Sequence, residues 1–303
     1  MTTLPPGPHG GDAWRLAGAL GVEVGEVLDL SASLNPVAPS VVGLVERHLD
    51  ALTRYPTDHR ATAALAEALD VEVDRVVLTN GGAEAIALVA RLLPVGRVDE
   101  PDFSLYARHL DRCEPGAPRW RSDPHNPTGR LAPAEDRAEV RDEAFYPLAT
   151  GRWTRGDPAA VVVGSLTKVF ACPGLRLGYV LAPDPGFADR IRAVRPEWSV
   201  NGLAAAVVPE LLATADLPAW RDRIAELRGQ LVDILRRHDL QPEPTDANYV
   251  WLPEAAGLRD RLLPHGVLLR AGDGFGAPDA VRIAVPDADG LDRLATALED
   301  IRP

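Results

Sequence analysis

Residues 164–179 read Gly164-Ser165-Leu166-Thr167-Lys168-Val169-Phe170-Ala171-Cys172-Pro173-Gly174-Leu175-Arg176-Leu177-Gly178-Tyr179 and contain Lys168, the only lysine in the 303-residue chain. The other 31 basic residues are arginines. An imine with an aldehyde requires a primary amine that can lose its proton near neutral pH, which a guanidinium cannot provide. A stray surface lysine is expected in a polar helix or loop. Lys168 instead follows an apolar predicted strand at 159–163 and precedes a glycine-rich turn, which favours a covalent role for its amine.

Composition limits the class of protein. The net charge of −12 argues against a nucleic-acid partner, because no basic stripe stands out. Cys113 and Cys172 are the only cysteines and lie far apart, so neither a disulfide framework nor a metal site is expected. No signal pattern opens the sequence and no apolar run approaches the ~20 residues that span a membrane. We therefore expect a cytoplasmic protein without a membrane partner.

A regular alternation of strand, turn and helix predicts an α/β fold. Predicted strands at 75–79, 138–145 and 161–164 each run into a polar or glycine-rich turn. Such alternation is typical of a mostly parallel sheet with helices on both faces. Past Pro183 the pattern changes to helices followed by two or three strands. We expect a large domain over 36–204, and a smaller α+β domain made of 1–35 plus 205–303.

Several turns carry candidate ligand-binding groups. The turn Asn80-Gly81-Gly82 before a helix can aim backbone N–H groups at a phosphate, although an ordinary turn reads the same way. Asn126 lies in the rigid turn Asn-Pro-Thr-Gly, where its amide can donate or accept, and Asp142 ends a predicted strand. The glycines of His9-Gly10-Gly11-Asp12 allow close backbone approach to a ligand, or form a surface turn.

Taken together, these motifs resemble the fold-type I pyridoxal phosphate enzymes of the class I/II aminotransferase group. The resemblance rests on Ser-Leu-Thr-Lys with Pro-Gly-Leu-Arg-Leu-Gly, Asn-Pro-Thr-Gly and Asp-Glu-Ala-Phe, and it covers nearly the whole chain. It implies a seven-stranded type of sheet and a homodimer with shared active sites. It also implies roles for particular residues: Lys168 as the Schiff-base lysine, Asp142 on the pyridinium nitrogen, Asn126 on the ring hydroxyl, Phe103 stacked on the ring, Gly82, Ala83, Ser165, Thr167 and Arg176 around the cofactor phosphate, and Tyr55 reaching a phosphate in the neighbouring subunit.

Within that group the chain is most similar to threonine-phosphate decarboxylases of cobalamin biosynthesis, and next to histidinol-phosphate aminotransferases. His9-Gly10-Gly11-Asp12 resembles the decarboxylases' His-Gly-Gly-Asn, and residues 197–201 resemble their Pro-Trp-Ser-Val-Asn. Phe145 stands where aminotransferases usually have a tyrosine. The implied substrate is a small phosphorylated amino acid or amine, bound through a Schiff base. Its implied contacts are His9, Gly10, Ser33, Arg270 and Arg282, the arginines taking phosphate and carboxylate.

Two other functions stay open at this point: a phosphate-substrate aminotransferase and, more distantly, a non-catalytic cofactor-binding module. The sequence also departs from the decarboxylases. Ser33 replaces a substrate-contacting asparagine, and Gly164 replaces a common arginine or similar residue. The spans 101–126 and 129–142 are shorter than usual, so we expect one helix-strand unit of the sheet edge to be trimmed.

Overall fold

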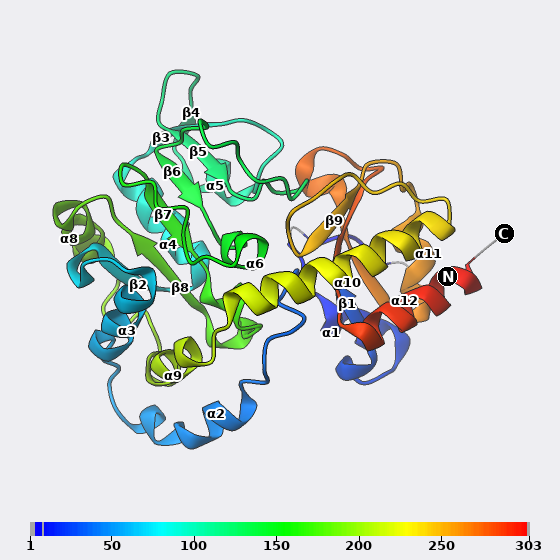
Figure 1. The fold of residues 1–303 in the computed structure, drawn as a ribbon, viewed down its shortest axis with the longest axis horizontal. Coiled ribbons are helices and arrows are strands. Elements are labelled where there is room, and N and C mark those ends of the chain that lie inside the picture. The colour runs from blue at the N-terminus through cyan, green and yellow to red at the C-terminus, as the bar shows by residue number, and fades with distance from the viewer. Residues whose placement is uncertain (1–3, 8, 302–303) are drawn as a thin grey trace.

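The computed structural model describes residues 4–7 and 9–301, and a seven-stranded sheet lies at its centre (Figure 1). The strand order is β2-β8-β7-β6-β5-β3-β4, and β8 alone runs antiparallel to its neighbours. The predicted α/β class with a mostly parallel sheet is confirmed. The strands are β2 (Val76–Asn80), β3 (Val95–Val98), β4 (Arg112–Cys113), β5 (Arg119–Ser122), β6 (Val140–Asp142), β7 (Val161–Gly164) and β8 (Leu177–Leu181).

Helices cover both faces of this sheet, because its central strands carry apolar side chains on both sides. Val162 packs into one core, whereas Val161 and Val163 pack into the other. The helices of this part are α2 (Val42–Arg47), α3 (His59–Leu69), α4 (Gly81–Leu92), α5 (Leu105–His109), α6 (Tyr146–Thr150), α7 (Leu166–Val169), α8 (Pro185–Val194) and α9 (Gly202–Ala213), with 3-10 turns η2 (Leu49–Thr53), η3 (Val73–Arg75) and η4 (Pro173–Leu175).

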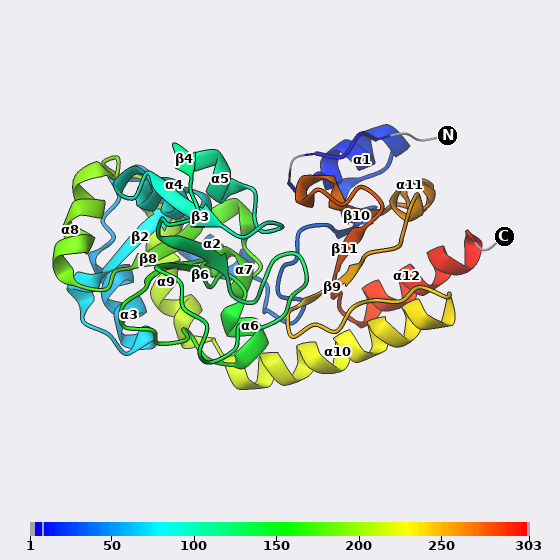
Figure 2. The same ribbon diagram turned by 90° about the horizontal axis from the view of Figure 1, so that it is seen from above.

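A second sheet of order β1-β10-β11-β9 lies beside the first (Figure 2). Its edge strand β1 comes from the segment before residue 36, called here the N-terminal arm. It pairs parallel with β10, while the other pairs of this sheet are antiparallel. The arm therefore pairs with the C-terminal part of the chain. The elements here are α1 (Ala13–Leu20), η1 (Val24–Glu26), β1 (Leu28–Leu30), β9 (Tyr249–Leu252), α11 (Leu258–Leu262), η5 (Leu263–His265), β10 (Val267–Ala271), η6 (Gly272–Phe275), β11 (Val281–Ala284) and α12 (Ala288–Asp300).

The long helix α10 (Leu217–Arg237) bridges the two sheets (Figure 1). Trp220 and Ile224 pack in the core of the large sheet, whereas Leu227 and Leu231 pack in the core of the small sheet. The boundary predicted at residue 204 falls inside α9, whose apolar side chains belong to the large-sheet core. The change of core lies inside α10 instead, because one continuous helix has no composition break to mark it.

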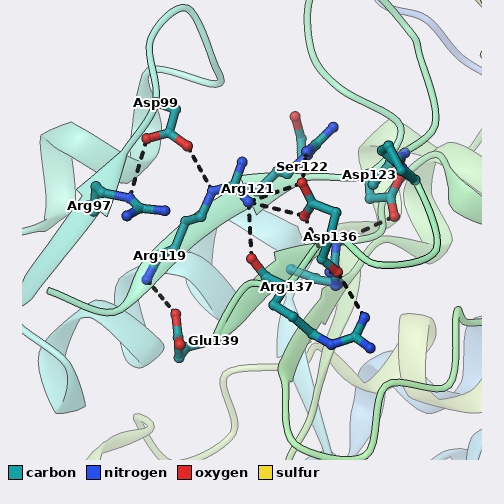
Figure 3. Close-up of polar contacts among 12 residues, drawn as sticks. Arg97, Asp99, Arg119, Arg121, Ser122, Asp123, Asp136, Arg137 and Glu139 are labelled. Atoms are coloured by element: carbon teal, nitrogen blue, oxygen red, sulfur yellow. Dashed lines mark hydrogen bonds and ion pairs between the residues drawn. The ribbon is translucent and has the colours of Figure 1, made fainter. Parts of the chain in front are cut away.

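The connection between β5 and β6 contains no helix in the described structure, and one face of the outer sheet is correspondingly polar. Arg97 pairs with Arg119 in register, and Arg121 pairs with Arg141, so these four side chains share one face. Asp136 reaches Arg119, Arg121 and Arg141, and its loop covers this face (Figure 3). Paired charges thus cover this face between the interior strands β6 and β5, where no helix lies in the described structure. The sheet keeps seven strands, so the expectation that a strand is trimmed from its edge was wrong.

Among the described residues, no single helix is long and apolar enough to cross a membrane; α9 and α10 pass such a test only as a pair, bent by 85° where they meet.

Candidate active site

Lys168 lies in α7, directly beyond the carboxyl end of β7. Its Nζ donates to the carbonyl oxygen of Ala32 at 2.8 Å and lies 5.8 Å from the centre of the Phe145 ring. Burial, together with the charges of Arg282 and Arg176, lowers the pKa of Lys168 to about 8. A substantial fraction of this amine is therefore neutral at pH 8, as attack on an aldehyde requires.

Residues 31–35 connect Lys168 to the small sheet. Besides the Ala32 carbonyl that accepts from Nζ, the main chain of Asn35 donates to the Lys168 carbonyl at 3.1 Å. Asn248, which precedes β9, donates to the carbonyls of Ser33 and Leu34, both at 3.1 Å. This segment joins the two sheets directly at the lysine.

Ser33, a predicted substrate residue, is fully buried with φ of 40°. Asparagine tolerates this left-handed region better than serine does. In the described structure the Ser33 hydroxyl is buried without a hydrogen-bond partner, so its contact with the substrate stays a prediction.

Asp142 ends β6 and lies next to β7 in register with Val163. One carboxylate oxygen accepts from the Tyr106 hydroxyl at 2.9 Å and the other from the Ala144 N–H at 3.0 Å. Burial raises the pKa of Asp142 to about 6. In the described part of the chain no arginine or lysine reaches ion-pair distance of this carboxylate, so it is a half-buried acceptor that lacks a cation.

Asn126 and Arg282 come from different sheets and meet at the site. Asn126 is buried in the turn after β5, and its Oδ1 accepts from Arg282 Nη1 at 2.6 Å. Since a guanidinium only donates, this contact fixes the amide orientation and leaves Nδ2 as the donor. Arg282 also stacks over the Tyr249 ring at 4.8 Å. Burial lowers the pKa of Arg282 to about 10.

Arg270 lies directly opposite Arg282 across the antiparallel pair β10 and β11. Like charges placed opposite each other destabilise a sheet, and both side chains are buried. Arg270 Nη1 donates to the Gly7 carbonyl at 2.9 Å, which attaches the N-terminal arm to this arginine. The arginine pair therefore forms a local concentration of positive charge that favours an anion.

The arm itself is tightly docked at Ser31. The Gly11 N–H donates to the Ser31 hydroxyl at 2.9 Å, and a Cβ added at Gly10 would lie 2.1 Å from the Ser31 carbonyl oxygen. Only glycine fits there. The His9 ring packs 5.8 Å from the Phe103 ring, and burial lowers the pKa of His9. The structure thus brings His9 and Gly10 to the site.

The start of α4 is open toward the same region. The helix begins at Gly81, where a tight turn was predicted, and Asn80 provides no side-chain cap. Gly178 lets β8 pack against this start, because a Cβ there would lie 2.5 Å from the Gly82 nitrogen. The Arg176 guanidinium lies against Gly81, and Ala83 is exposed. Free N–H groups, the helix dipole and an arginine together form an anion site.

Ser165 and Thr167 differ in what their hydroxyls do. Ser165 lies next to the start of α4, since a Cβ added at Gly82 would be 3.8 Å from the Ser165 Cβ. The Thr167 hydroxyl instead donates to the Leu177 carbonyl and accepts from the Leu177 N–H, both at 3.1 Å. The phosphate contact predicted for Thr167 has no support in this geometry, because its hydroxyl is committed to β8.

Gly164, one of the departures from the decarboxylases, has a steric explanation. A Cβ at this position would lie 2.0 Å from the ring of Tyr179, which is fully buried in the adjacent strand β8. A larger residue at 164 is therefore incompatible with Tyr179.

Phe103 and Tyr55 lie in contrasting environments. Phe103 is partly buried and packs edge-on against Tyr106, with ring centres 5.8 Å apart. Tyr55 is 81% exposed and contacts Trp198, with ring centres 4.8 Å apart. Tyr55 is not enclosed by its own chain, so its assignment to a neighbouring subunit stays a prediction.

Sequence reasoning missed several polar residues of the site. Tyr106 follows Phe103 by three residues, and this helical spacing was the available signal. Asp102 and Ser122 are buried and hydrogen-bonded to each other through the Ser122 hydroxyl. No motif marked them, because Asp102 lies in the loop after β3 and Ser122 ends β5, and only the folded sheet brings the two together.

Comparisons with known proteins agree with this geometry. Residues 120–298 match the family model described as aminotransferase class I and II. The chain belongs to the class I and II aminotransferase family. Histidinol-phosphate aminotransferase 1 of Dechloromonas aromatica is 28% identical, covering 99% of this chain and 96% of that protein. Threonine-phosphate decarboxylase of Salmonella typhimurium is 30% identical, and the match covers 97% of this chain and 96% of that protein.

A solved structure shows the same fold. Histidinol-phosphate aminotransferase from Sinorhizobium meliloti, in complex with pyridoxal-5'-phosphate, has a TM-score of 0.82 at 21% identity, covering 98% of this chain and 95% of that one. The chain is a pyridoxal phosphate-dependent enzyme, and the alternative of a non-catalytic module is set aside.

The residues present fit this cofactor. The open start of α4 beside Arg176 suits its phosphate, and Asp142 is an acceptor without a cation, as a protonated ring nitrogen requires. Lys168 supplies an amine whose pKa is lowered to about 8. Asn126 presents its Nδ2 as an amide donor, because its Oδ1 accepts from Arg282.

Proposed function

We propose that this enzyme decarboxylates threonine phosphate, with histidinol-phosphate transamination as the second candidate. The observation that carries the proposal is the buried arginine pair, Arg270 opposite Arg282, beside a docked N-terminal arm. Two adjacent guanidinium groups suit a substrate with two anionic groups. Threonine phosphate carries a phosphate and a carboxylate, whereas histidinol phosphate carries only the phosphate.

The second candidate has support of its own. The relatives include histidinol-phosphate aminotransferases at 28% identity, close to the 30% of the decarboxylase. Phe145 weighs toward the decarboxylase, because it has no hydroxyl to offer the cofactor ring. Its ring instead packs edge-on against Tyr249, with centres 5.1 Å apart.

Each residue then has a specific task. When bound, pyridoxal phosphate supplies an aldehyde for amines and an electron-accepting ring. Lys168 would provide the amine that holds it and would later exchange protons, and Asp142 would keep the ring nitrogen protonated. Asn126 Nδ2 would donate to the ring oxygen, and Phe103 would pack on the ring. Gly82, Ala83, Ser165 and Arg176 would hold the cofactor phosphate.

The arginines decide the outcome of the reaction. Arg270 and Arg282 would hold the substrate carboxylate and so would set which bond at Cα breaks. Loss of the carboxylate as carbon dioxide would leave Cα to take a proton from Lys168 Nζ. Loss of the Cα proton to Lys168 Nζ instead would begin transamination.

We also propose that the enzyme is a homodimer with shared sites. Tyr55 is 81% exposed and Trp198 58% exposed, and the neighbouring helices expose Val42, Leu49 and Leu52. Exposed apolar side chains gathered on neighbouring elements are typical of a subunit interface. Mixing Lys168→Arg and Tyr55→Phe subunits tests it: recovery of activity above that of either parent supports shared sites, and none argues against them.

A paired assay tests the reaction. The purified holoenzyme receives threonine phosphate alone, or histidinol phosphate with 2-oxoglutarate, while carbon dioxide and glutamate are followed. Carbon dioxide from the first mixture supports the decarboxylase. Glutamate only from the second mixture replaces it with the aminotransferase.

A further inference from the structure

Asp102 is a buried carboxylate that lacks a cation. Its residue is 2% exposed, and no ion pair in the described part of the chain includes it. Burial raises its pKa to about 6, so at pH 8 it is ionised and can only accept hydrogen bonds. Burying an unpaired charge is costly, and a purely structural position is filled at lower cost by a neutral side chain.

Several donors converge on this carboxylate. The Phe103 N–H donates at 2.7 Å and the Ser122 N–H at 3.1 Å, and the Ser122 hydroxyl donates to the same group. Asp102 therefore joins the loop after β3, which carries the ring-stacking Phe103, to the end of β5. Arg121, on the opposite face of β5, acts on it only at longer range.

The connection continues through Ser122 to the site. Since the Ser122 hydroxyl donates its proton to Asp102, its oxygen lone pair is directed to the Asn126 N–H, which donates at 2.7 Å. Asn126 Oδ1 in turn accepts from Arg282 at 2.6 Å. One chain of hydrogen bonds thus leads from Asp102 to Asn126, whose Nδ2 would face the cofactor ring.

We propose that Asp102 is a positioning residue that, through Ser122, sets Asn126 against the edge of the cofactor ring and Phe103 against its face. This inference depends on the cofactor of the family and not on which substrate is used. Failure of the decarboxylase proposal therefore leaves it intact, and its own failure leaves that proposal intact.

The test compares cofactor binding in matched holoprotein variants at pH 8. Asp102→Asn places an amide N–H₂ where donors already converge, and Ser122→Ala removes the link while Asp102 keeps its charge. Ser122→Thr keeps the hydroxyl. Asp136→Asn is the control, since this carboxylate serves the arginine-covered face of the sheet (Figure 3). The readouts are the dissociation constant of pyridoxal phosphate and the circular dichroism of the bound cofactor, which reports the tilt of its ring.

We expect Asp102→Asn and Ser122→Ala each to weaken cofactor binding about tenfold and to reduce the cofactor circular dichroism. The double variant should bind the cofactor as tightly as each single variant, because both changes break the same chain of hydrogen bonds. Ser122→Thr should retain both readouts, and Asp136→Asn should change only thermal stability.

Three results overturn the proposal: cofactor affinity and dichroism within twofold of the original protein, additive effects in the double variant, or equal losses in Asp136→Asn. If Asp102→Asn does not fold, the two Ser122 variants decide. Weaker cofactor binding in Ser122→Ala, with normal binding in Ser122→Thr, supports the proposed role of the hydrogen bonds through Ser122. Equal cofactor binding in the two variants contradicts it.

Discussion

Strands β5 and β6 bury polar groups on both faces, but the two faces differ in how their charges are balanced. Asp142 and Asp102, on the α4 and α5 side, accept hydrogen bonds but pair with no arginine in the described structure. Arg141, the residue before Asp142, points to the other face and lies 3.5 Å from Asp136 and 3.6 Å from Asp123.

The pKa values differ in the same way. Burial raises the pKa of Asp142 and of Asp102 to about 6. Burial acts in the same direction on Asp136, but hydrogen bonds and charge from Arg119 and Arg121 lower its pKa overall. A carboxylate left without a cation in the folded chain marks the side where a cationic ligand group belongs. The paired face has a structural role in place of the missing helix.

Replacing Lys168 should have the largest effect. Lys168→Arg keeps the charge but cannot form an imine, so kcat should fall by about 10³-fold or more. The bound cofactor should also lose its Schiff-base absorption. Steady-state kinetics and an absorption spectrum measure both effects, and a variant that keeps the Schiff-base band would contradict the assignment.

Asp142→Asn should have the second-largest effect on kcat. The amide can still accept from Tyr106, but it cannot balance a protonated ring nitrogen. Loss of a buried charge partner costs about 3–5 kcal/mol, equivalent to roughly 10²- to 10⁴-fold in kcat. Unchanged kcat with normal cofactor occupancy would show that Asp142 is not the ring-nitrogen partner.

The pH dependence of apoprotein stability should distinguish the two faces. The folded pKa of Asp142, about 6, lies above its ordinary 3.8, so the native state holds more protons between these values. Its contribution is therefore present at pH 4 and lost as pH rises to 6, by up to about 3 kcal/mol. Asp136 has a lowered pKa, so its contribution is lost only as pH falls below 3.8. Urea titrations should show that the free energy of unfolding of Asp142→Asn changes less between pH 4 and 6 than that of the original protein. An unchanged pH dependence would contradict the proposed difference between the two faces.

Arg282→Lys tests the substrate side. A single ammonium cannot contact Asn126 and a substrate anion in the same fork geometry. The KM of the phosphorylated substrate should rise about 10- to 100-fold, as expected for loss of a charge-assisted hydrogen bond. Arg130→Lys, at a side chain 57% exposed, is the matched control and should leave KM unchanged. Equal KM values in both variants would exclude Arg282 from substrate binding.

Asp136→Asn should have the smallest effect on function. It weakens contacts to Arg119 and Arg121, and we expect about 1–3 kcal/mol lower stability with unchanged kcat. Denaturant unfolding and steady-state kinetics check this. A fall in kcat at full cofactor occupancy would mean that the paired face also serves the site.

The difference between the faces also explains what the sequence could predict. Lys168, Asp142 and the start of α4 follow strands of a regular alternation, so their meeting at one sheet edge was predictable. The short span between 129 and 142 predicted a missing element, but only a helix between the interior strands β5 and β6 is missing from the described chain, and the sheet keeps seven strands. The charge network on this face was not predicted, because alternate arginines in β5 and β6 pair only after the strands come into register.

The remaining parts depend on contacts distant in sequence. The arginine pair requires the register of β10 and β11, and the link from Asp102 to Asn126 requires two loops to meet. The domain boundary was misplaced because α10 runs through it as one helix. Thr167 was assigned to the phosphate from its place in a motif, whereas its hydroxyl binds the main chain of Leu177.

Borohydride reduction of the holoprotein, followed by peptide mapping, tests the central proposal most directly. Lys168 is the only lysine, so reduction should fix one phosphopyridoxyl group per chain, on the peptide that contains residue 168. A label confined to the N-terminal amine, or none in a protein saturated with cofactor, would contradict the assignment of Lys168 and the site built around it.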